Sequence, residues 1–534
     1  MSTERKFFGT DGVRGPYGGP VVNEAFFARL AYAAGQWVNG RASQNGPTRG
    51  DSPDSGVATD MKRKRVAIGC DTRASGGSLA EAVMAGLRLA KMRPTHLGVL
   101  PTPAVALAVK NEGISLGVVI TASHNPAGDN GIKFFKQGGL KLSDEEEAQI
   151  EALIPETLEW EAELAARLAP KSSDEIQAQL KKMALFNREG VVKLSTVLRH
   201  MNGEDYVKTM ARLLPTGALR GWHVVLDAAN GAASAVSPTV LRCYEAEVLE
   251  IGSRSLGNTI GIANSIKSLP QFSSMPSGQL EAMLDALRAG RSDGQINDGC
   301  GSEHPEKMCA AVREHGARLG IAHDGDGDRC VLCDERGEVL DGDEILTILA
   351  LHALRAGRLG ADTLVVTVQS NLGVDAALAA AGGLVVRTPV GDRHVAEKMR
   401  ELGATLGGES SGHIICADVS PTGDGLVAAL RVMEVMRATG RPLSELRGWL
   451  KKFPQASATV AIAAGAPKPA LQTMPALSAA IHALETALGA RGRVLARWSG
   501  TEPKLRLLVE GPDEGTVQAG LGALAAAARA DLGV

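Results

Sequence analysis

The sequence predicts an α/β protein of several domains, both from its length and from a repeated order of elements. The chain has 534 residues, 44% of them hydrophobic, which is too long for one hydrophobic core and leads us to expect three or four domains. Three times, an apolar strand leads through a polar or glycine-containing turn into an alanine-rich amphipathic helix. Units of this kind build layered domains with mainly parallel sheets. We therefore expect three similar α/β domains.

The elements of these units lie far apart along the chain. The strands are expected at 66–71, 224–227 and 364–368, followed by helices at 78–92, 232–242 and 373–381. From about residue 452 the pattern changes, because a strand-like segment at 458–462 precedes helices near 475–488 and 514–531. This last part is predicted to be a smaller α+β domain. The expected domains are 1–158, 200–338, 339–448 and 452–534.

Three segments are expected to be insertions or linkers. Residues 39–62 are rich in Gly, Ser, Asp and Asn and lead into a basic run that suits a solvated loop before a strand. Residues 156–200 are charged with a helical pattern, which is typical of a connector between domains. Residues 253–294 mix Ser, Gly and Pro ahead of the helical stretch Gly278–Leu287 and indicate a surface excursion.

The composition limits the functional classes. The formal net charge is −3 and only 3% of residues are aromatic, so the chain has neither a global positive field nor many aromatic side chains for nucleic-acid binding. A phosphorylated substrate would need local clusters of Arg and Lys. No apolar run approaches the roughly 20 residues that span a bilayer, and the N-terminus lacks an apolar signal core. We expect a soluble, cytoplasmic protein that binds neither membrane nor nucleic acid.

The seven cysteines are odd in number and scattered, as expected of reduced thiols. Cys330 and Cys333 form a CxxC pair, but an apolar run around them indicates a buried strand, and no second CxxC completes a zinc site. We predict that this pair is structural.

Ser123 follows the apolar run 117–120 and opens a polar turn that ends at Pro126. A side chain at the carboxyl end of a strand faces the crevice where α/β sheets bind ligands. A free serine hydroxyl is a weak nucleophile without a base or a metal. Once phosphorylated it carries nearly two negative charges, which His124 and Lys133 would partly balance. An ordinary turn is the competing interpretation of this motif alone.

Asp324, Asp326 and Asp328 alternate with glycines after another apolar run. Alternate side chains of an extended chain share a face, and the glycines let the loop curl so that the carboxylates converge. A hard divalent cation with oxygen ligands is the natural partner of such a cluster. An EF-hand loop is the rival, since Glu335 falls at the twelfth position. It fails because Arg329 stands where a glycine is required and strands flank the loop.

Two further clusters suit a sugar phosphate. Arg497, with hydroxyls and turn amides around a glycine, makes a phosphate cradle to which Arg506 can add a second guanidinium. Within Gly407–His413, Glu409 and Ser411 offer an acceptor and a donor at positions that suit vicinal sugar hydroxyls. An ordinary turn is the rival interpretation of each cluster.

Two shorter motifs complete the set. Arg14 is presented by the glycine-bounded loop Phe8–Gly15, and Gly391–Arg393 is the least specific of all. No Gly-Lys pair occurs in the chain, so a Walker A loop is absent and ATP-dependent transfer by a P-loop is disfavoured.

Taken together, these motifs resemble the α-D-phosphohexomutase superfamily and, within it, the phosphoglucosamine mutase branch. They occur in the family's order at Phe8–Gly15, Thr121–Lys133, Asn297–Glu306, Asp324–Arg329, Gly391–Val395, Gly407–His413 and Arg497–Arg506. The resemblance implies an α/β fold in which three similar mixed-sheet α/β domains and a smaller C-terminal α+β domain surround a central cleft.

The resemblance also implies residue roles. Ser123 matches the active-site phosphoserine, which completes a Mg²⁺ site formed by Asp324, Asp326 and Asp328. The positively charged or proton-transferring wall of the cleft matches Arg14, His124, Lys133, Arg329 and His413, among which the general acid or base stays open. The expected contacts to the sugar and its phosphate are Glu409, Ser411, His413, Arg393, Arg497, Ser499, Gly500, Thr501 and Arg506.

The implied reaction converts glucosamine 6-phosphate to glucosamine 1-phosphate for amino-sugar and cell-wall synthesis. A phosphoserine enzyme, Mg²⁺ and a hexosamine 1,6-bisphosphate intermediate take part, and the partner is a small sugar phosphate, with a homodimer as the expected assembly. One alternative is a phosphomannomutase or phosphoglucomutase acting on hexose phosphates. Another is a non-catalytic sugar-phosphate-binding or Ca²⁺-binding protein, which would have no use for a serine at a strand end. Ser410 and Trp498 depart from the subfamily pattern.

Overall fold

The computed structural model describes residues 5–9, 11–44, 64–157, 203–254, 291–292, 294–463, 465–499 and 503–534. Most of the expected insertions and linkers at 39–62, 156–200 and 253–294, including Gly278–Leu287, lie outside these residues. Gly500 and Thr501 lie outside them as well. In the parts of the chain that are described, no helix is both long enough and apolar enough to cross a membrane.

The first sheet has six strands in the order β1-β5-β4-β2-β3, with β6 paired to β5. Its strands are β1 (Val13–Pro16), β2 (Arg65–Cys70), β3 (Arg93–Val99), β4 (Leu116–Ile120), β5 (Asp129–Lys136) and β6 (Leu140–Lys141). Its helices are α1 (Glu24–Gln44), α3 (Gly76–Leu89), α4 (Thr102–Glu112) and α5 (Asp144–Glu151). The predicted first strand and helix correspond to β2 and α3. The helix α1 runs on into the first residues of the segment expected to be an insertion.

The second sheet has the order β13-β12-β11-β7-β8. Its strands are β7 (His223–Asp227), β8 (Glu247–Ile251), β11 (Leu319–His323), β12 (Cys330–Cys333) and β13 (Val339–Leu340). The helices here are α9 (Glu204–Met210), α10 (Val236–Cys243) and α13 (Glu306–His315), while β9 (Ser253–Arg254) pairs separately with β10 (Arg291–Ser292). The helix expected over 232–242 is divided into a short 3₁₀ turn at Ala232–Ser234 and α10. Because β13 pairs with β12, this sheet extends two residues past the boundary expected at 338.

The third sheet has the order β15-β14-β16-β17. Its strands are β14 (Thr363–Thr367), β15 (Leu384–Thr388), β16 (Leu406–Gly408) and β17 (Ile414–Cys416). The accompanying helices are α14 (Gly342–Arg355), α15 (Leu372–Ala380), α16 (Asp392–Leu402), α17 (Gly425–Thr439) and α18 (Leu443–Leu446).

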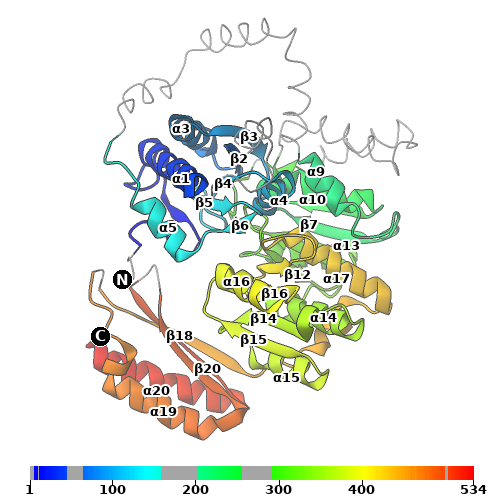
Figure 1. Cartoon of the computed structure of the whole chain (residues 1–534). Helices are drawn as coiled ribbons and strands as arrows, with labels where there is room; N and C mark the ends of the chain where they lie inside the picture. Colours follow the sequence, from blue (N-terminus) through cyan, green and yellow to red (C-terminus); the bar gives the residue numbers. More distant parts are fainter. Residues whose placement is uncertain are drawn as a thin grey trace, which may run out of the picture.

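The C-terminal part is an antiparallel unit with its own sheet and helices (Figure 1). It contacts the third domain where Glu510 accepts a hydrogen bond of 3.2 Å from Leu372 N at the start of α15. Its strands β18 (Gln455–Ala461), β20 (Lys504–Glu510) and β19 (Arg493–Trp498) lie in that order, and the helices are α19 (Pro475–Leu488) and α20 (Glu514–Leu532). These helices bury Leu477, Leu524 and neighbouring apolar residues against the sheet. The predicted α+β unit is therefore confirmed.

The first three sheets share one connectivity. In each, three parallel strands are followed by a fourth that runs antiparallel to the third, giving β3-β2-β4-β5, β8-β7-β11-β12 and β15-β14-β16-β17. The predicted fold of three similar mixed-sheet α/β domains is confirmed. One continuous core joins them, since Val105 of α4, Leu226 of β7 and Leu346 of α14 belong to the same apolar cluster.

Candidate active site

The main motifs occupy the same position in the three α/β domains, namely the loop from the third strand to the antiparallel fourth strand. Ser123 lies between β4 and β5, the three aspartates lie between β11 and β12, and Glu409–His413 lies between β16 and β17. These equivalent loops converge, since Ser123 contacts Asp324 and His413 lies 3.7 Å from Asp328.

Ser123 and the aspartates are in direct contact. The Ser123 hydroxyl donates a hydrogen bond of 2.6 Å to Asp324 Oδ2, across the boundary between two domains. Ser123 is only 1% exposed. Its φ of 53° is in the left-handed region, which is uncommon for a residue other than glycine. The strand-end serine predicted from the sequence therefore meets the acidic loop.

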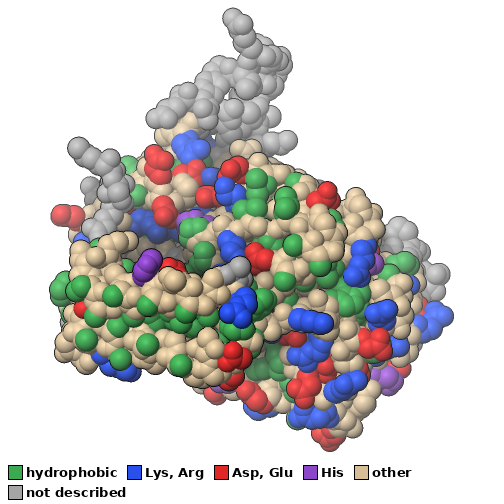
Figure 2. Space-filling model, turned by 90° about the horizontal axis from the view of Figure 1, so that it is seen from below, with side chains coloured by type: hydrophobic (Ala, Val, Ile, Leu, Met, Phe, Trp, Pro, Cys, Tyr) green, Lys and Arg blue, Asp and Glu red, His purple; other side chains and the backbone are tan. Residues whose placement is uncertain are grey.

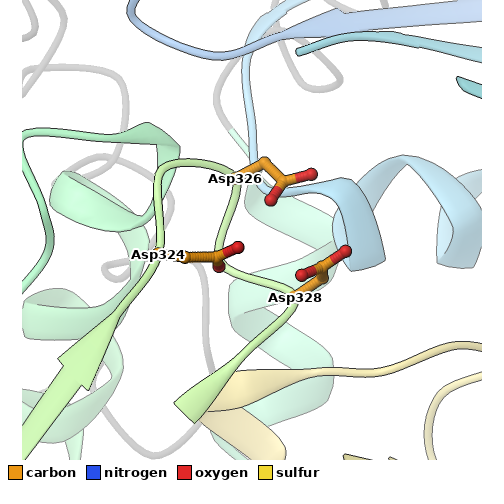
Figure 3. Close-up of side chains that lie close together, drawn as sticks. All are labelled: Asp324, Asp326 and Asp328. Carbon is orange, nitrogen blue, oxygen red and sulfur yellow. The ribbon is translucent and has the colours of Figure 1, made fainter. Parts of the chain in front are cut away.

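The three aspartates form a compact cluster along the turn that joins β11 to β12 (Figure 3). One carboxylate oxygen from each lies within 4.8 Å of the others, and all three residues are buried. Asp326 Oδ1 and Asp328 Oδ1 are buried and have no hydrogen-bond partner among the described residues. Uncompensated buried carboxylate oxygens are costly, so the residues present fit a divalent cation with oxygen ligands.

Lys133 lies against this cluster. Its ammonium group is 2.8 Å from Asp326 Oδ2, 2.9 Å from Asp328 Oδ2 and 2.9 Å from Asp11 Oδ2. Burial alone would lower the pKa of Lys133, but the three carboxylates hold it well above the ordinary value. Burial alone would likewise raise the pKa of Asp328, yet Lys133 holds it well below the ordinary value. Lys133 is therefore a buried, positively charged hydrogen-bond donor beside the aspartates.

A second chain of charges joins the third domain to the same cluster. The ammonium group of Lys141 forms salt bridges with both Asp11 and Asp392. His413 Nε2 lies 3.0 Å from Asp392 Oδ2, and its Nδ1 lies 3.7 Å from Asp328 Oδ1. Burial disfavours the charged imidazole, but the two aspartates raise the pKa of His413 to about 10. Residues from all three α/β domains thus share one buried electrostatic network.

The other predicted wall residues surround Ser123. His124 Nδ1 is 3.4 Å from Ser123 Oγ, and burial, with the charges of Arg329 and Arg14, lowers the pKa of His124 to about 4. Arg329 lies 3.6 Å from Glu303, and its Nε is buried with no hydrogen-bond partner in the described part of the chain. Arg14 bonds the side chain of Asp11 in its own loop.

The expected sugar loop and phosphate loop come from the third domain and the C-terminal unit. Glu409 accepts from Gly391 N at 3.0 Å, and Ser411 Oγ lies 3.4 Å from Glu409. Arg497 and Arg506 are cross-strand neighbours on β19 and β20. Burial and the charge of Arg506 lower the pKa of Arg497, whereas Glu409 raises it.

Ser499 is buried beside Arg497 at the end of β19. The effect of Glu409 on the pKa of Arg497 shows that the sugar loop and the phosphate loop lie near each other. The face of the molecule seen in Figure 2 is hollowed, with Lys or Arg, His and acidic side chains at the edge of the hollow.

Arg393, expected to contact substrate, lies in a different setting. Its guanidinium group is 2.8 Å from Glu147 and 2.8 Å from Asp144, and it donates to Leu142 O at 3.2 Å. Arg5 joins the same carboxylates. In this arrangement Arg393 links α16 to α5 and therefore bridges the third domain to the first.

Three residues of the network were missed by the sequence analysis. Asp11 and Asp392 lie in motifs that were noticed for their arginines, and Lys141 lies in no motif. Each of these three residues is a charged side chain in an otherwise apolar or glycine-rich segment. This pattern indicates a site only once the fold shows that the three segments lie together.

Comparisons with known proteins agree with this architecture. The family models for phosphoglucomutase/phosphomannomutase match alpha/beta/alpha domain I at residues 55–160, alpha/beta/alpha domain III at 341–453 and the C-terminal domain at 460–527. A phosphoglucosamine mutase of Moorella thermoacetica is 40% identical over 95% of this chain and 96% of its own length. Another, of Anaeromyxobacter dehalogenans, is 38% identical over 99% of this chain and 100% of its own.

The chain belongs to the phosphoglucosamine mutase family. It is therefore an enzyme of the mutase class, and the predicted membership of the phosphohexomutases is confirmed. Among solved structures, a phosphoglucomutase/phosphomannomutase family protein of Burkholderia thailandensis has a TM-score of 0.65 at 19% identity, with 99% of this chain and 98% of that chain covered. The N-acetylphosphoglucosamine mutase of Aspergillus fumigatus has a TM-score of 0.56 at 17% identity, with 99% and 96% covered. At these identities the two solved structures show a similarity of fold alone.

Proposed function

We propose that this enzyme interconverts glucosamine 6-phosphate and glucosamine 1-phosphate through a phosphoserine at Ser123. The observation that carries the proposal is the 2.6 Å contact between Ser123 Oγ and Asp324, in a chain of the phosphoglucosamine mutase family. A strand-end serine beside a buried acidic cluster suits phosphoryl transfer, because the hydroxyl can hold the group between two half-reactions.

In the first half-reaction, the bond between Ser123 Oγ and phosphorus breaks while the free 1- or 6-hydroxyl of the sugar forms a new bond to phosphorus. The hydroxyl proton passes to a base, and a hexosamine 1,6-bisphosphate results. After the bisphosphate turns around, its other phosphoryl group moves to Ser123 and the proton returns to the sugar oxygen. His124 stands beside the reacting oxygen, while Lys133, Arg14 and Arg329 supply positive charge to the transferring group.

Asp324, Asp326 and Asp328 would hold the divalent ion, which we take to be Mg²⁺, together with an oxygen of phosphorylated Ser123. When bound, the ion supplies positive charge that offsets the developing charge on the phosphoryl oxygens. Lys133 keeps the carboxylates close together, because its single ammonium group already contacts two of the three.

Substrate would be held at two ends. Glu409 and Ser411 suit the sugar hydroxyls, with His413 and Arg393 as further predicted contacts from the same domain. The predicted cradle for the non-reacting phosphate comprises Arg497, Ser499, Gly500, Thr501 and Arg506. A cradle far from Ser123 in sequence lets one site accept the sugar in either orientation.

All seven cysteines are free thiols, which supports the proposed cytoplasmic location. A homodimer is the expected assembly.

The test compares turnover of the 6-phosphates of glucosamine, glucose and mannose by the wild-type enzyme with Mg²⁺ and a trace of sugar bisphosphate. We expect glucosamine 6-phosphate to have the highest kcat/KM, and Ser123→Ala to lose activity on all three while keeping its fold. Ser410, where the subfamily often carries Gln, is the residue that makes the hexose comparison worth doing. A higher kcat/KM on glucose or mannose phosphate would reject the proposed substrate, and an active Ser123→Ala variant would reject the mechanism.

A further inference from the structure

We propose that Arg73 and Asn297 are positioning residues that hold the phosphoserine loop in its reactive geometry, one from each of two domains. The inference rests on the proposed function, because it concerns the loop that carries Ser123. Neither side chain contacts the Ser123 hydroxyl, and both contact the backbone on either side of it.

The loop needs such support, because Ser123 has a φ of 53°. Backbone in this region is uncommon for residues with a Cβ and persists only where the surroundings fix it. The backbone carbonyl groups of the turn from Ser123 to Pro126 lie outside a regular strand, so they need hydrogen-bond donors from elsewhere in the protein.

Arg73 satisfies these carbonyls from within the first domain. Its side chain is fully buried, and all five of its N–H donors have a place to donate. Nη2 donates to Ser123 O at 3.0 Å and to Asn125 O at 2.8 Å. Nη1 donates to Asp129 O at 2.8 Å and to Pro126 O, while Nε donates to Asp71 Oδ2 at 3.0 Å.

The backbone N–H of Ser123 is fixed through Asp71, the carboxylate that pairs with Arg73. Ser123 N donates to Thr121 Oγ1 at 2.8 Å, and Thr121 Oγ1 donates to Asp71 Oδ2 at 2.7 Å. Asp71 thus orients both Thr121 and Arg73. The backbone before and after the serine therefore depends on one buried carboxylate and guanidinium pair.

Asn297 holds the same carbonyls from the second domain. Its Nδ2 donates to Ser123 O at 2.7 Å and to Asn125 O at 2.9 Å, so each carbonyl accepts from both Arg73 and Asn297. Asn297 has a φ of 59°, and its backbone N–H donates to Ala229 O at 3.0 Å. Its side chain is thereby directed across the domain boundary.

The double clamp also places the serine loop against the metal loop. A Cβ atom added at Gly325 would fall 2.7 Å from Ser123 O and 3.0 Å from Asn297 Nδ2. The two loops are therefore packed without spare room, and Asn297 stands between them. Phosphoryl transfer depends on alignment, and a displacement of about 1 Å can cost about 100-fold in rate. Loss of the clamp should therefore lower kcat more than it raises KM.

The first test replaces Arg73 by Lys, which keeps the charge beside Asp71 but cannot reproduce the planar set of five donors. The matched control is Arg242→Lys, since Arg242 is a largely buried arginine paired with Glu250 outside the site. We expect Arg73→Lys to lower kcat at least 30-fold with KM within threefold of wild type. Arg242→Lys should leave both constants within twofold.

The second test uses Asn297→Gly, which suits the positive φ and removes the whole side chain together with its two donated hydrogen bonds. Its control is Lys91→Gly, because Lys91 is exposed and also has a positive φ of 61°. We expect Asn297→Gly to lower kcat about tenfold and Lys91→Gly to leave it unchanged. This variant keeps the proposal testable if Arg73→Lys does not fold.

Hydrogen exchange of the amides at 121–125 gives a readout that does not depend on the substrate. Exchange there should quicken at least tenfold in Arg73→Lys and Asn297→Gly but not in either control. If the wild type fails to turn over any sugar phosphate, the proposed function is wrong and the exchange data still decide the clamp. The clamp is overturned if every folded clamp variant keeps kcat within threefold of wild type, or if exchange at 121–125 is unchanged in them.

Discussion

The side chains around Ser123 are charged and buried, so each one's protonation depends on its immediate neighbours. Burial and the adjacent carboxylates of Asp328 and Asp326 raise the pKa of Asp324 well above its ordinary value. In the same loop, Lys133 and His413 hold the pKa of Asp328 well below it, against the effect of burial. Two aspartates four positions apart thus differ because Lys133 and His413 outweigh burial at Asp328, whereas the charge of Arg329 only partly offsets burial at Asp324.

At this scale the sequence predicted the reacting groups but not their supports. Ser123 and the three aspartates were recognisable because each stands in a compact motif at a strand end. Arg73 and Asn297 act through backbone carbonyls that are distant in sequence. Arg73 lies in no motif, and Asn297 opens the motif Asn297–Glu306 but has no local pattern that indicates a contact with backbone carbonyls.

A buried aspartate outside the site offers a test of the effect of burial on a carboxyl group. Burial raises the pKa of Asp343 to about 6 from 3.8. Because the folded-state pKa exceeds that of the unfolded chain, ionisation of Asp343 opposes folding progressively as the pH rises from about 4 to above 6. This corresponds to roughly 3 kcal/mol. We expect Asp343→Asn, measured by denaturant unfolding, to gain stability relative to wild type by up to that amount between pH 4 and pH 7. A difference that does not change with pH would contradict this assignment.

At the scale of elements, strand and helix positions were predicted well where the apolar pattern was uninterrupted. The helices at 475–488 and 514–531 correspond to α19 and α20, and the first strands of all three α/β domains were located. The differences have local causes. The helix expected over 232–242 breaks after a 3₁₀ turn, and β13 joins the second sheet through pairing with β12 that only the tertiary structure reveals.

The packing of α1 on α3 gives a prediction for a single glycine. A Cβ atom at Gly86 of α3 would collide with the carbonyl of Ala28 in α1, whereas a Cβ atom at Gly40 of α1 would meet nothing within 4 Å. Alanine favours a helix interior over glycine by up to about 1 kcal/mol, but overpacking costs about 1–3 kcal/mol. We expect Gly86→Ala to lower the free energy of unfolding by about 2 kcal/mol and Gly40→Ala to raise it slightly, as measured by urea denaturation. Equal effects of the two changes would show that the helices do not approach so closely.

At the scale of the whole molecule, repetition of one topology creates the site. The same loop of each α/β domain supplies the serine, the acidic cluster or the sugar-binding motif, and a shared core holds the domains together. The sequence indicated three similar domains from their first strands. It did not show that the motifs occupy equivalent loops, because the third strands differ in sequence and β16 has three residues where β4 and β11 have five.

The bridge made by Arg393 is expected to matter for the assembly of the domains. Arg393→Gln removes a buried cation shared by Glu147 and Asp144, and loss of one partner of a buried pair is destabilising. We expect the free energy of unfolding to fall by about 2 kcal/mol in thermal or urea unfolding. Arg220→Gln, which breaks an exposed pair with Glu245, should leave the unfolding midpoint unchanged. An increase in KM for the sugar phosphate at unaltered stability would instead support the substrate contact predicted for Arg393.

The most direct test of the central claim is to follow the phosphoryl group itself. Phosphopeptide mass spectrometry of the purified enzyme should locate phosphate on Ser123, and enzyme carrying a labelled phosphate should pass the label to glucosamine 6-phosphate in a single turnover. The account predicts that the label leaves Ser123 and appears in the sugar bisphosphate. Phosphate found on another residue, or a label that stays on the protein while product forms, would contradict it.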